Sequence, residues 1–278
     1  MVTAVASDGG AAGRYAKADL KQTPAVLTWL SKQWGRYPFD AIGGVAPAAA
    51  FGFALENQTR PVYTRDFWSE GSNIYVIVHE QAHQWFGDSV SVDRWRDIWL
   101  NEGFASFSEW LYSEQHGDGT AQQIFDATYA VHPSSDPFWR LAVGDPGKGH
   151  EFDAAVYDRG AMTLQALRNR IGDKAFTTVM RTWAKDRRYG NGRVSQFKAL
   201  AEQVSHQQAR RVLRRLADAD HQARRHRRQR VPGTRPLGPL PRPGGRRPLP
   251  GAVTVDASTL RATLARMQHV HDVAGGRS

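Results

Sequence analysis

The sequence contains no cysteine. Disulfides, thiolate nucleophiles and cysteine metal ligands are therefore excluded, and any transition-metal site has to use His, Asp and Glu. It also lacks any run approaching the ~18 apolar residues that a membrane-spanning helix needs. No charged segment followed by an apolar core marks a signal peptide at the start. We therefore expect no membrane segment and a cytoplasmic location by default, and an extracellular location stays open if the N-terminus is truncated.

Aromatic residues and acidic charge are scarce in the C-terminal part of the chain. All nine tryptophans lie at or before Trp183, and the last aromatic residue is Phe197. Between residues 206 and 250 there are thirteen arginines, two aspartates and no lysine or glutamate, a net charge of +11 that accounts for the +10 of the whole chain. Because aromatic side chains are not interleaved with these arginines, we expect no nucleic-acid partner.

Residues 206–278 are rich in Arg, Pro and Gly, a composition that cannot bury a core. We expect a low-complexity tail, and two origins for it stay open. It is either a genuine basic tail or a segment translated out of frame. Codons for "VLRRLADADH" (residues 212–221) can be chosen so that reading one base later gives "SFDAWLTRT", which resembles the aromatic-bearing segments upstream.

Before residue 206 the chain shows mainly helical periodicity. "TPAVLTWLSKQWG" places apolar residues on one face and ends with Gly35 as a stop signal. "SNIYVIVHEQAHQWFG" predicts a buried helix with Ser72 as its cap and Gly87 after its end, and "DIWLNEGFASFSEWLYSEQHG" predicts a second, closed by Gly117. "AVYDRGAMTLQALRNRIG" and "KAFTTVMRTWAKD" predict two more. With one short strand region near residues 51–59, the fold class is α+β and mostly helical.

The buried helix around residue 80 carries a metal-binding pattern. His79 and His83 are four residues apart and so share one helical face, from which two imidazoles can reach one zinc ion. Glu80 is rotated ~100° from His79, which suits a general base beside the metal rather than a ligand. This is the H-E-x-x-H arrangement of zinc metallopeptidases, although a five-residue match also arises by chance.

A catalytic zinc needs a third protein ligand, and Glu102 is the candidate. It follows His83 after 18 intervening residues and lies among apolar residues, where a buried carboxylate needs a cation. The alternative is that Glu102 is a first-turn glutamate favoured by the helix dipole, with Asn101 as the cap.

The stretch "HEQAHQWFGDSVSVDRWRDIWLNEGFASFSEW" closely resembles the zinc core of the aminopeptidase N family, which are gluzincin metallopeptidases. The resemblance implies that His79, His83 and Glu102 bind zinc and that Glu80 is the base. "VYDRGAMTLQALR" resembles the family's Tyr-x-Lys-Gly segment, with Arg159 at the lysine position. This implies that Tyr157 hydrogen-bonds the oxyanion, whereas on its own it would be taken as a packing residue.

"FALENQT" resembles the family's Gly-Ala-Met-Glu-Asn strand. The resemblance implies that Glu56 accepts the free α-amine of the substrate, with Asn57 beside it; the alternative is a solvent-facing glutamate on an edge strand. Phe53 and Leu55 depart from the family's Gly and Met. Because glycine permits close backbone approach to a ligand, Phe53 bears on the substrate pocket more than on the zinc.

The resemblance implies a thermolysin-like catalytic domain over residues 21–205, after a residual interdomain segment at residues 1–20 and before the tail at residues 206–278. It also implies one Zn²⁺ and peptide substrates with a free N-terminus. The leading function is a zinc aminopeptidase. The alternatives are a related zinc hydrolase with another substrate and a non-catalytic remnant that binds zinc. The sequence does not indicate an oligomeric state.

Overall fold

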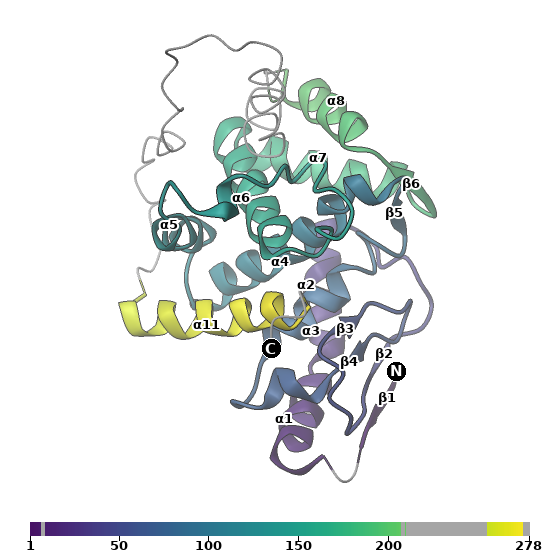
Figure 1. Ribbon diagram of the computed structural model, residues 1–278. Coiled ribbons are helices and arrows are strands. Elements are labelled where there is room, and N and C mark those ends of the chain that lie inside the picture. Colours follow the sequence, from purple (N-terminus) through teal and green to yellow (C-terminus); the bar gives the residue numbers. More distant parts are fainter. Residues whose placement is uncertain (7–8, 207–208, 210–254, 275–278) are drawn as a thin grey trace.

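The structure is a computed structural model that describes residues 1–6, 9–206, 209 and 255–274 (Figure 1). The predicted low-complexity segment and its alternative reading frame thus fall mostly outside the described residues. Helices predominate in the described part, with one small mixed sheet and one two-stranded sheet. The prediction of a mostly helical α+β fold is confirmed. None of the described helices is long and apolar enough to cross a bilayer.

The mixed sheet lies at the N-terminal end of the fold. Its strands are ordered β1 (Val2–Val5), β2 (Gly43–Ala46), β4 (Val62–Tyr63) and β3 (Ala54–Leu55). β1 and β4 run parallel to β2, whereas β3 is antiparallel to β4. The strand predicted over residues 51–59 is thus confined to β3. A Cβ on Gly43 would lie 1.9 Å from the carbonyl oxygen of Val2, so only glycine allows β1 to approach β2 here.

A residual interdomain segment is expected from the sequence at residues 1–20, and in the structure the described residues of this range pack against the rest of the fold. They form β1 and α1 (Gly10–Leu20), which packs beside the sheet. Asp19 near the end of α1 is buried and accepts hydrogen bonds from the indole of Trp68, the hydroxyl of Ser72 and the backbone N–H of Asn73. Asp19 therefore fixes the backbone just before the buried helix that begins at Ile74.

That buried helix is α3 (Ile74–Ala82), and it follows α2 (Thr23–Trp34) and a 3₁₀ turn, η1 (Arg65–Trp68). α2 ends at Gly35 as predicted. The prediction of Ser72 as the cap of α3 is wrong, because its hydroxyl donates to Asp19 and the N-cap position is Asn73. α3 also ends earlier than Gly87, with His83 at its C-cap in a helical conformation.

The second zinc-motif helix, α4 (Trp99–His116), crosses α6 (Ala154–Ile171) at very short range. A Cβ on Gly103 would lie 2.6 Å from the Cα of Gly160, and the reverse distance is the same. Two glycines thus let the backbones touch. α4 ends at Gly117 in the left-handed conformation, as predicted, but it begins at Trp99. Asn101 is therefore inside the first turn and is not the cap.

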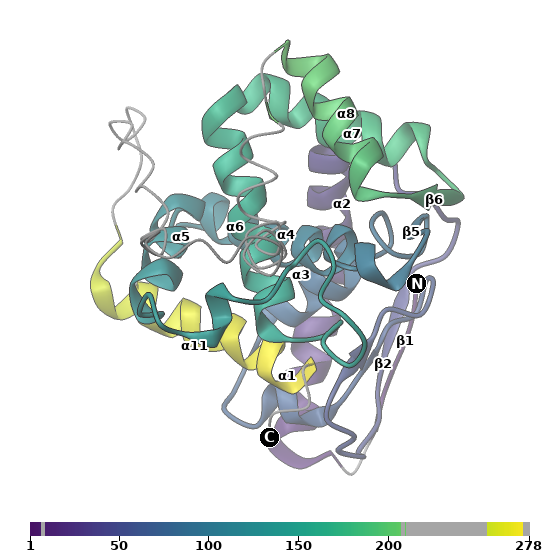
Figure 2. The same cartoon turned by 45° about the horizontal axis from the view of Figure 1, so that its top comes forward.

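The remaining elements surround these helices. α7 (Asp173–Asp186) and α8 (Val194–Ser205) lie at the end of the molecule opposite α1 (Figure 2). α5 (Ala121–Val131) packs on α4 and α6, η2 (Trp95–Asp97) precedes α4, and η3 (Pro137–Trp139) precedes α6. β5 (Val90–Val92) pairs in parallel with β6 (Gly190–Gly192).

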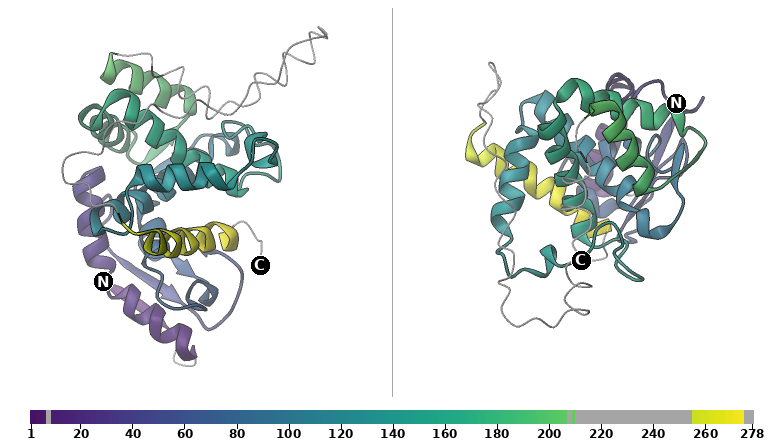
Figure 3. Two further views of the ribbon diagram at one scale, coloured as in Figure 1. Left: turned by 90° about the vertical axis from the view of Figure 1, so that its left-hand side faces the viewer. Right: turned by 90° about the horizontal axis from the view of Figure 1, so that it is seen from above.

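The last described element is α11 (Ala257–Ala274), inside the region predicted to be a low-complexity tail. It lies across α3, α4 and α6 (Figures 1 and 3). Its buried residues Thr263, Met267, Val270 and His271 follow helical spacing on one face. α11 therefore packs as part of the core.

Candidate metal centre

Two helices bring three ligand-type atoms together. His79 and His83 project from α3, and Glu102 projects from the first turn of α4. Glu102 Oε2 lies 3.5 Å from His79 Nε2 and 3.3 Å from His83 Nε2. A tetrahedral ion with ligands at 2.0–2.2 Å separates neighbouring ligand atoms by about 3.3 Å. The observed spacing therefore fits one zinc-sized ion, and all three residues are at most 5% exposed.

The outward ring nitrogens of both histidines are held by acceptors. His79 Nδ1 lies 2.7 Å from Glu109 Oε1, and His83 Nδ1 lies 3.0 Å from the carbonyl oxygen of Phe86. A carbonyl can only accept, so His83 Nδ1 carries a proton. In the neutral imidazole this leaves the Nε2 lone pair directed at Glu102. Such second contacts fix the ring orientation and tautomer of metal ligands.

Electrostatics favour an ionised carboxylate at Glu102. Burial raises the pKa of this group, but the charges and hydrogen bonds of His83 and His79 outweigh burial and lower the pKa to about 2. Glu102 is therefore ionised over the whole neutral range. A buried carboxylate facing two imidazoles is a donor set that suits zinc.

Glu80 and Tyr157 lie beside the three donors. Burial raises the pKa of Glu80 to about 8, with nearby Glu56 and Glu102 adding to the effect and the two histidines opposing it. The Tyr157 ring is fully buried and stacks on His79 with centroids 5.9 Å apart. Burial, followed by the charges of Glu102, Glu80 and Glu56, raises the pKa of Tyr157 well above its usual value. The phenol is thus protonated and able to donate.

Glu56 and Asn57 follow β3, and only Glu56 is turned toward the centre. Glu56 is half-buried, and its charge raises the pKa of Glu80, His83 and Tyr157. Gln84 anchors this segment by donating to the Glu56 carbonyl at 3.2 Å and accepting from Thr59 N–H at 2.7 Å.

Other residues of the FALENQT segment are exposed to solvent. Asn57 is exposed, as are the departures Phe53 and Leu55. Arg159 is buried away from the centre and donates to the carbonyls of Phe138 and Leu141 around η3.

A second group of buried polar residues adjoins the histidines, and the sequence interpretation missed it. It comprises Ser106 and Glu109 of α4, Asp158 of α6 and His271 of α11. Glu109 is seven residues after Glu102, which places both on one helical face, so the spacing held a usable signal. Nothing in the sequence linked His271 to them.

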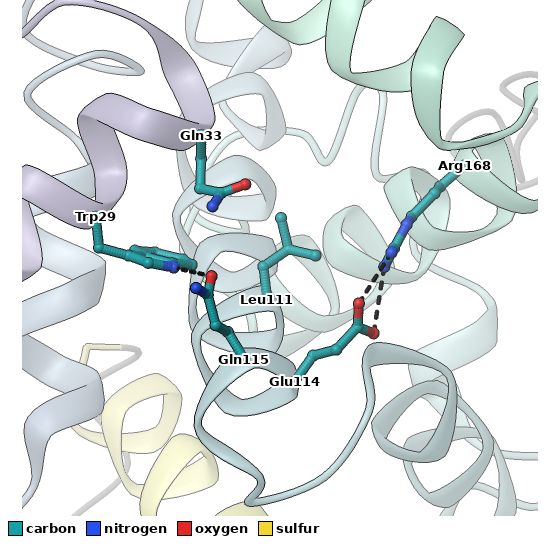
Figure 4. Close-up of a pocket in the computed structure, with 6 residues that line it drawn as sticks. All are labelled: Trp29, Gln33, Leu111, Glu114, Gln115 and Arg168. Atoms are coloured by element: carbon teal, nitrogen blue, oxygen red, sulfur yellow. Dashed lines mark hydrogen bonds and ion pairs between the residues drawn. The ribbon is translucent and has the colours of Figure 1, made fainter. Parts of the chain in front are cut away.

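A depression elsewhere on the surface holds no ligand-type cluster. It lies between α2, α4 and α6, where Arg168 pairs with Glu114 and Trp29 donates to Gln115 (Figure 4). Its residues on α4 are Leu111, Glu114 and Gln115, which lie at least nine positions beyond Glu102, or about 14 Å at the helical rise. The depression therefore does not belong to the metal centre.

Two crossing helices that carry two imidazoles and one carboxylate, with a glutamate beside them, define the gluzincin class of metallopeptidase domain. The family model described as "Peptidase family M1 domain" matches residues 62–216, more than half of the chain. The chain belongs to peptidase family M1, and the resemblance seen in the sequence is confirmed.

Known relatives and solved structures agree with this assignment. The chain is 35% identical to the glutamyl aminopeptidase of Bos taurus over 147 residues, or 50% of this chain and 15% of that protein. It is 31% identical to the aminopeptidase N of Rattus norvegicus over 203 residues, or 64% and 20%. An M1 zinc metallopeptidase from Deinococcus radiodurans, solved with a Tyr-Ser-Ala substrate, superposes with a TM-score of 0.62 and 28% identity, covering 71% of this chain and 44% of that one. The matches thus span only 15% and 20% of the length of these two curated relatives.

Proposed function

We propose that the chain carries the zinc centre of an aminopeptidase, which removes N-terminal residues from peptides. The observation that carries the proposal is the convergence of three buried ligand atoms at the spacing of one zinc ion, with Glu80 beside them. The assignment to family M1 supports it, as do relatives that bear aminopeptidase names.

The residues that would hold one Zn²⁺ are His79, His83 and Glu102. A second candidate group among the described residues shares His79 and adds Glu109 and His271. Its separation of 2.7 Å between His79 Nδ1 and Glu109 Oε1 is a hydrogen-bond distance, which favours a supporting role over a second ion. When bound, zinc supplies a Lewis acid that polarises the peptide carbonyl and makes water a better nucleophile at neutral pH.

The chain's own residues do the proton transfers. Glu80 accepts a proton from the attacking water and returns it to the leaving nitrogen, and a pKa near neutrality suits both steps. Tyr157 stays protonated and donates a hydrogen bond to the oxygen on which charge develops. The Glu56 carboxylate binds the free α-amine of the substrate, with Asn57 next to it in the chain, which would restrict cleavage to the first residue.

Hydrolysis of fluorogenic aminoacyl amides tests this assignment. Glu80→Gln should lower kcat by about 10²–10⁴-fold, the usual contribution of a general base, while zinc still binds at one ion per chain. Glu70→Gln changes an exposed glutamate near the start of α3 and should leave kcat unchanged. Activity that persists in Glu80→Gln would contradict the mechanism.

The free-amine requirement has its own test. N-acetylation of the substrate should abolish hydrolysis by the wild-type chain, because Glu56 then has no cation to bind. Equal rates on free and acetylated substrates would instead favour a related zinc hydrolase. Zinc bound at one ion per chain without any hydrolysis would favour a non-catalytic zinc-binding remnant.

A further inference from the structure

His271 reaches the metal centre from a helix far along the chain. It is 1% exposed and lies near the end of α11, 162 residues beyond Glu109. Its Nε2 lies 3.3 Å from Glu109 Oε1, and its Nδ1 lies 2.9 Å from Asp158 Oδ1. The imidazole therefore sits between carboxylates of α4 and α6.

The hydrogen-bond directions around Nε2 are set by its neighbours. The Ser106 hydroxyl donates to the backbone carbonyl of Glu102 at 2.9 Å, so its oxygen is free to accept from His271 Nε2 at 3.2 Å. A carboxylate oxygen also accepts. His271 is therefore a donor to both Ser106 and Glu109.

Glu109 links His271 to the metal ligand. The same oxygen, Glu109 Oε1, accepts hydrogen bonds from His79 Nδ1 at 2.7 Å and from His271 Nε2 at 3.3 Å. Glu109 is 0% exposed, so no solvent can take over if one donor is lost. A carboxylate that orients a metal-binding histidine needs partners of its own to keep its place.

We propose that His271 is a positioning residue for the zinc centre, acting through Glu109 on His79. The proposal rests on the proposed zinc site and goes beyond it, because it makes metal affinity depend on α11. The ring of His271 also stacks on Tyr157 with centroids 5.2 Å apart, so the same imidazole contacts α6, the helix that carries Tyr157.

Simple docking of α11 is the alternative role, and another histidine of the same helix provides the control. His269 Nε2 contacts the carbonyl oxygen of Asp66 at 2.9 Å, and its ring meets the edge of Phe67. It anchors α11 to η1 and has no contact with Glu109. Loss of this anchor should lower stability without acting directly on the metal centre.

Zinc dissociation constants of the full chain, measured by competition with a chromophoric chelator, test the proposal. His271→Ala should weaken zinc binding about 10-fold, the lower end of the range for residues that support metal ligands. His271→Gln should lose less, because its amide can still donate to Glu109. The zinc dissociation constant of His269→Ala should stay within about twofold of the wild-type value, which is small beside the roughly 10-fold change expected for His271→Ala.

A double-mutant cycle shows whether His271 acts through Glu109. In a Glu109→Gln background, His271→Ala should produce no further loss of zinc affinity. The d–d absorption bands of the Co²⁺-loaded protein should shift in His271→Ala and Glu109→Gln but not in His269→Ala. If His271→Ala does not fold, as judged by circular dichroism, His271→Gln takes its place in the cycle.

Three outcomes would overturn the proposal: wild-type zinc affinity in His271→Ala, equal losses in the two histidine variants, or additive losses in the cycle. A wild-type chain that fails to bind zinc would instead refute the proposed function. The two failures are therefore distinguishable.

Discussion

The close backbone contact between α4 and α6 predicts an unusual response to a Gly→Ala substitution. Alanine in place of glycine within a helix normally stabilises by up to about 1 kcal/mol. At Gly103 the added Cβ would lie 2.6 Å from the Cα and 2.8 Å from the carbonyl carbon of Gly160. Carbon atoms pack at about 3.5–4.0 Å, so α4 and α6 would have to separate by about 1 Å.

The net effect follows from comparing the two contributions. Overpacking costs about 1–3 kcal/mol, and the upper end applies because the obstructing atoms are main chain and cannot rotate away. After the helical gain is subtracted, Gly103→Ala should lower the free energy of unfolding by about 2 kcal/mol. It should also weaken zinc binding, because the proposed ligand Glu102 directly precedes the contact on α4.

Urea denaturation of the zinc-free chain measures the stability change. Gly13→Ala is the matched control, since Gly13 lies within α1 and, outside the backbone of that helix, its added Cβ would come no closer than 3.5 Å to any atom of the described residues. This variant should gain about 0.5–1 kcal/mol. If Gly103→Ala is as stable as the wild type, or gains as Gly13→Ala does, the packing argument is refuted.

Two further predictions concern buried carboxyl groups. Asp19→Ala leaves three hydrogen-bond donors without their acceptor and should lower the free energy of unfolding by about 3 kcal/mol or more. Ser72→Ala removes only one donor and should lower it by about 1 kcal/mol. Equal losses of the two variants in urea denaturation would contradict this. The raised pKa values of Glu80 (about 8) and His271 (about 10) give stability that is present below pH 4.5 and 6.5, respectively, and lost as pH rises through the raised values. The lowered pKa of Glu102 adds nothing in this window, because its contribution is complete above pH 4.5. The melting temperature of the zinc-free chain should therefore fall between pH 5 and pH 8. Over the same range the rise in melting temperature on adding zinc should become larger, since zinc requires unprotonated imidazoles. A rise that does not change with pH would refute this.

Helical periodicity was enough to predict the elements that carry the metal centre. Two histidines four residues apart share a face whatever the surrounding fold, and an apolar setting predicts burial of Glu102. The structure brings all three together. Glu109 could have been predicted in the same way, because it is seven residues after Glu102 and so lies on the same face of α4.

Features that depend on distant partners were not predictable in this way. β1 and β2 are short, rich in small residues and paired across about 40 intervening positions, so no local pattern marks them. Ser72 has the chemistry of a helix cap, but a carboxylate from α1 takes its hydroxyl. The composition after residue 206 predicted no buried core in that region. It did not indicate that an apolar face of α11 would pack against α3 and α4.

The distribution of buried charge explains why the metal and α11 belong to one unit. Four buried carboxyl groups come from three helices: Glu80, Glu102, Glu109 and Asp158. Buried carboxylates are stable only beside cations or hydrogen-bond donors. Among the described residues, His271 is a buried cation-forming side chain outside the proposed ligand set that contacts two of these carboxyl groups, those of Glu109 and Asp158. Zinc at the proposed site would neutralise one side of the cluster, and His271 lies at the other side. Because each reduces the unfavourable charge that the other would face, zinc binding and docking of α11 should stabilise one another reciprocally.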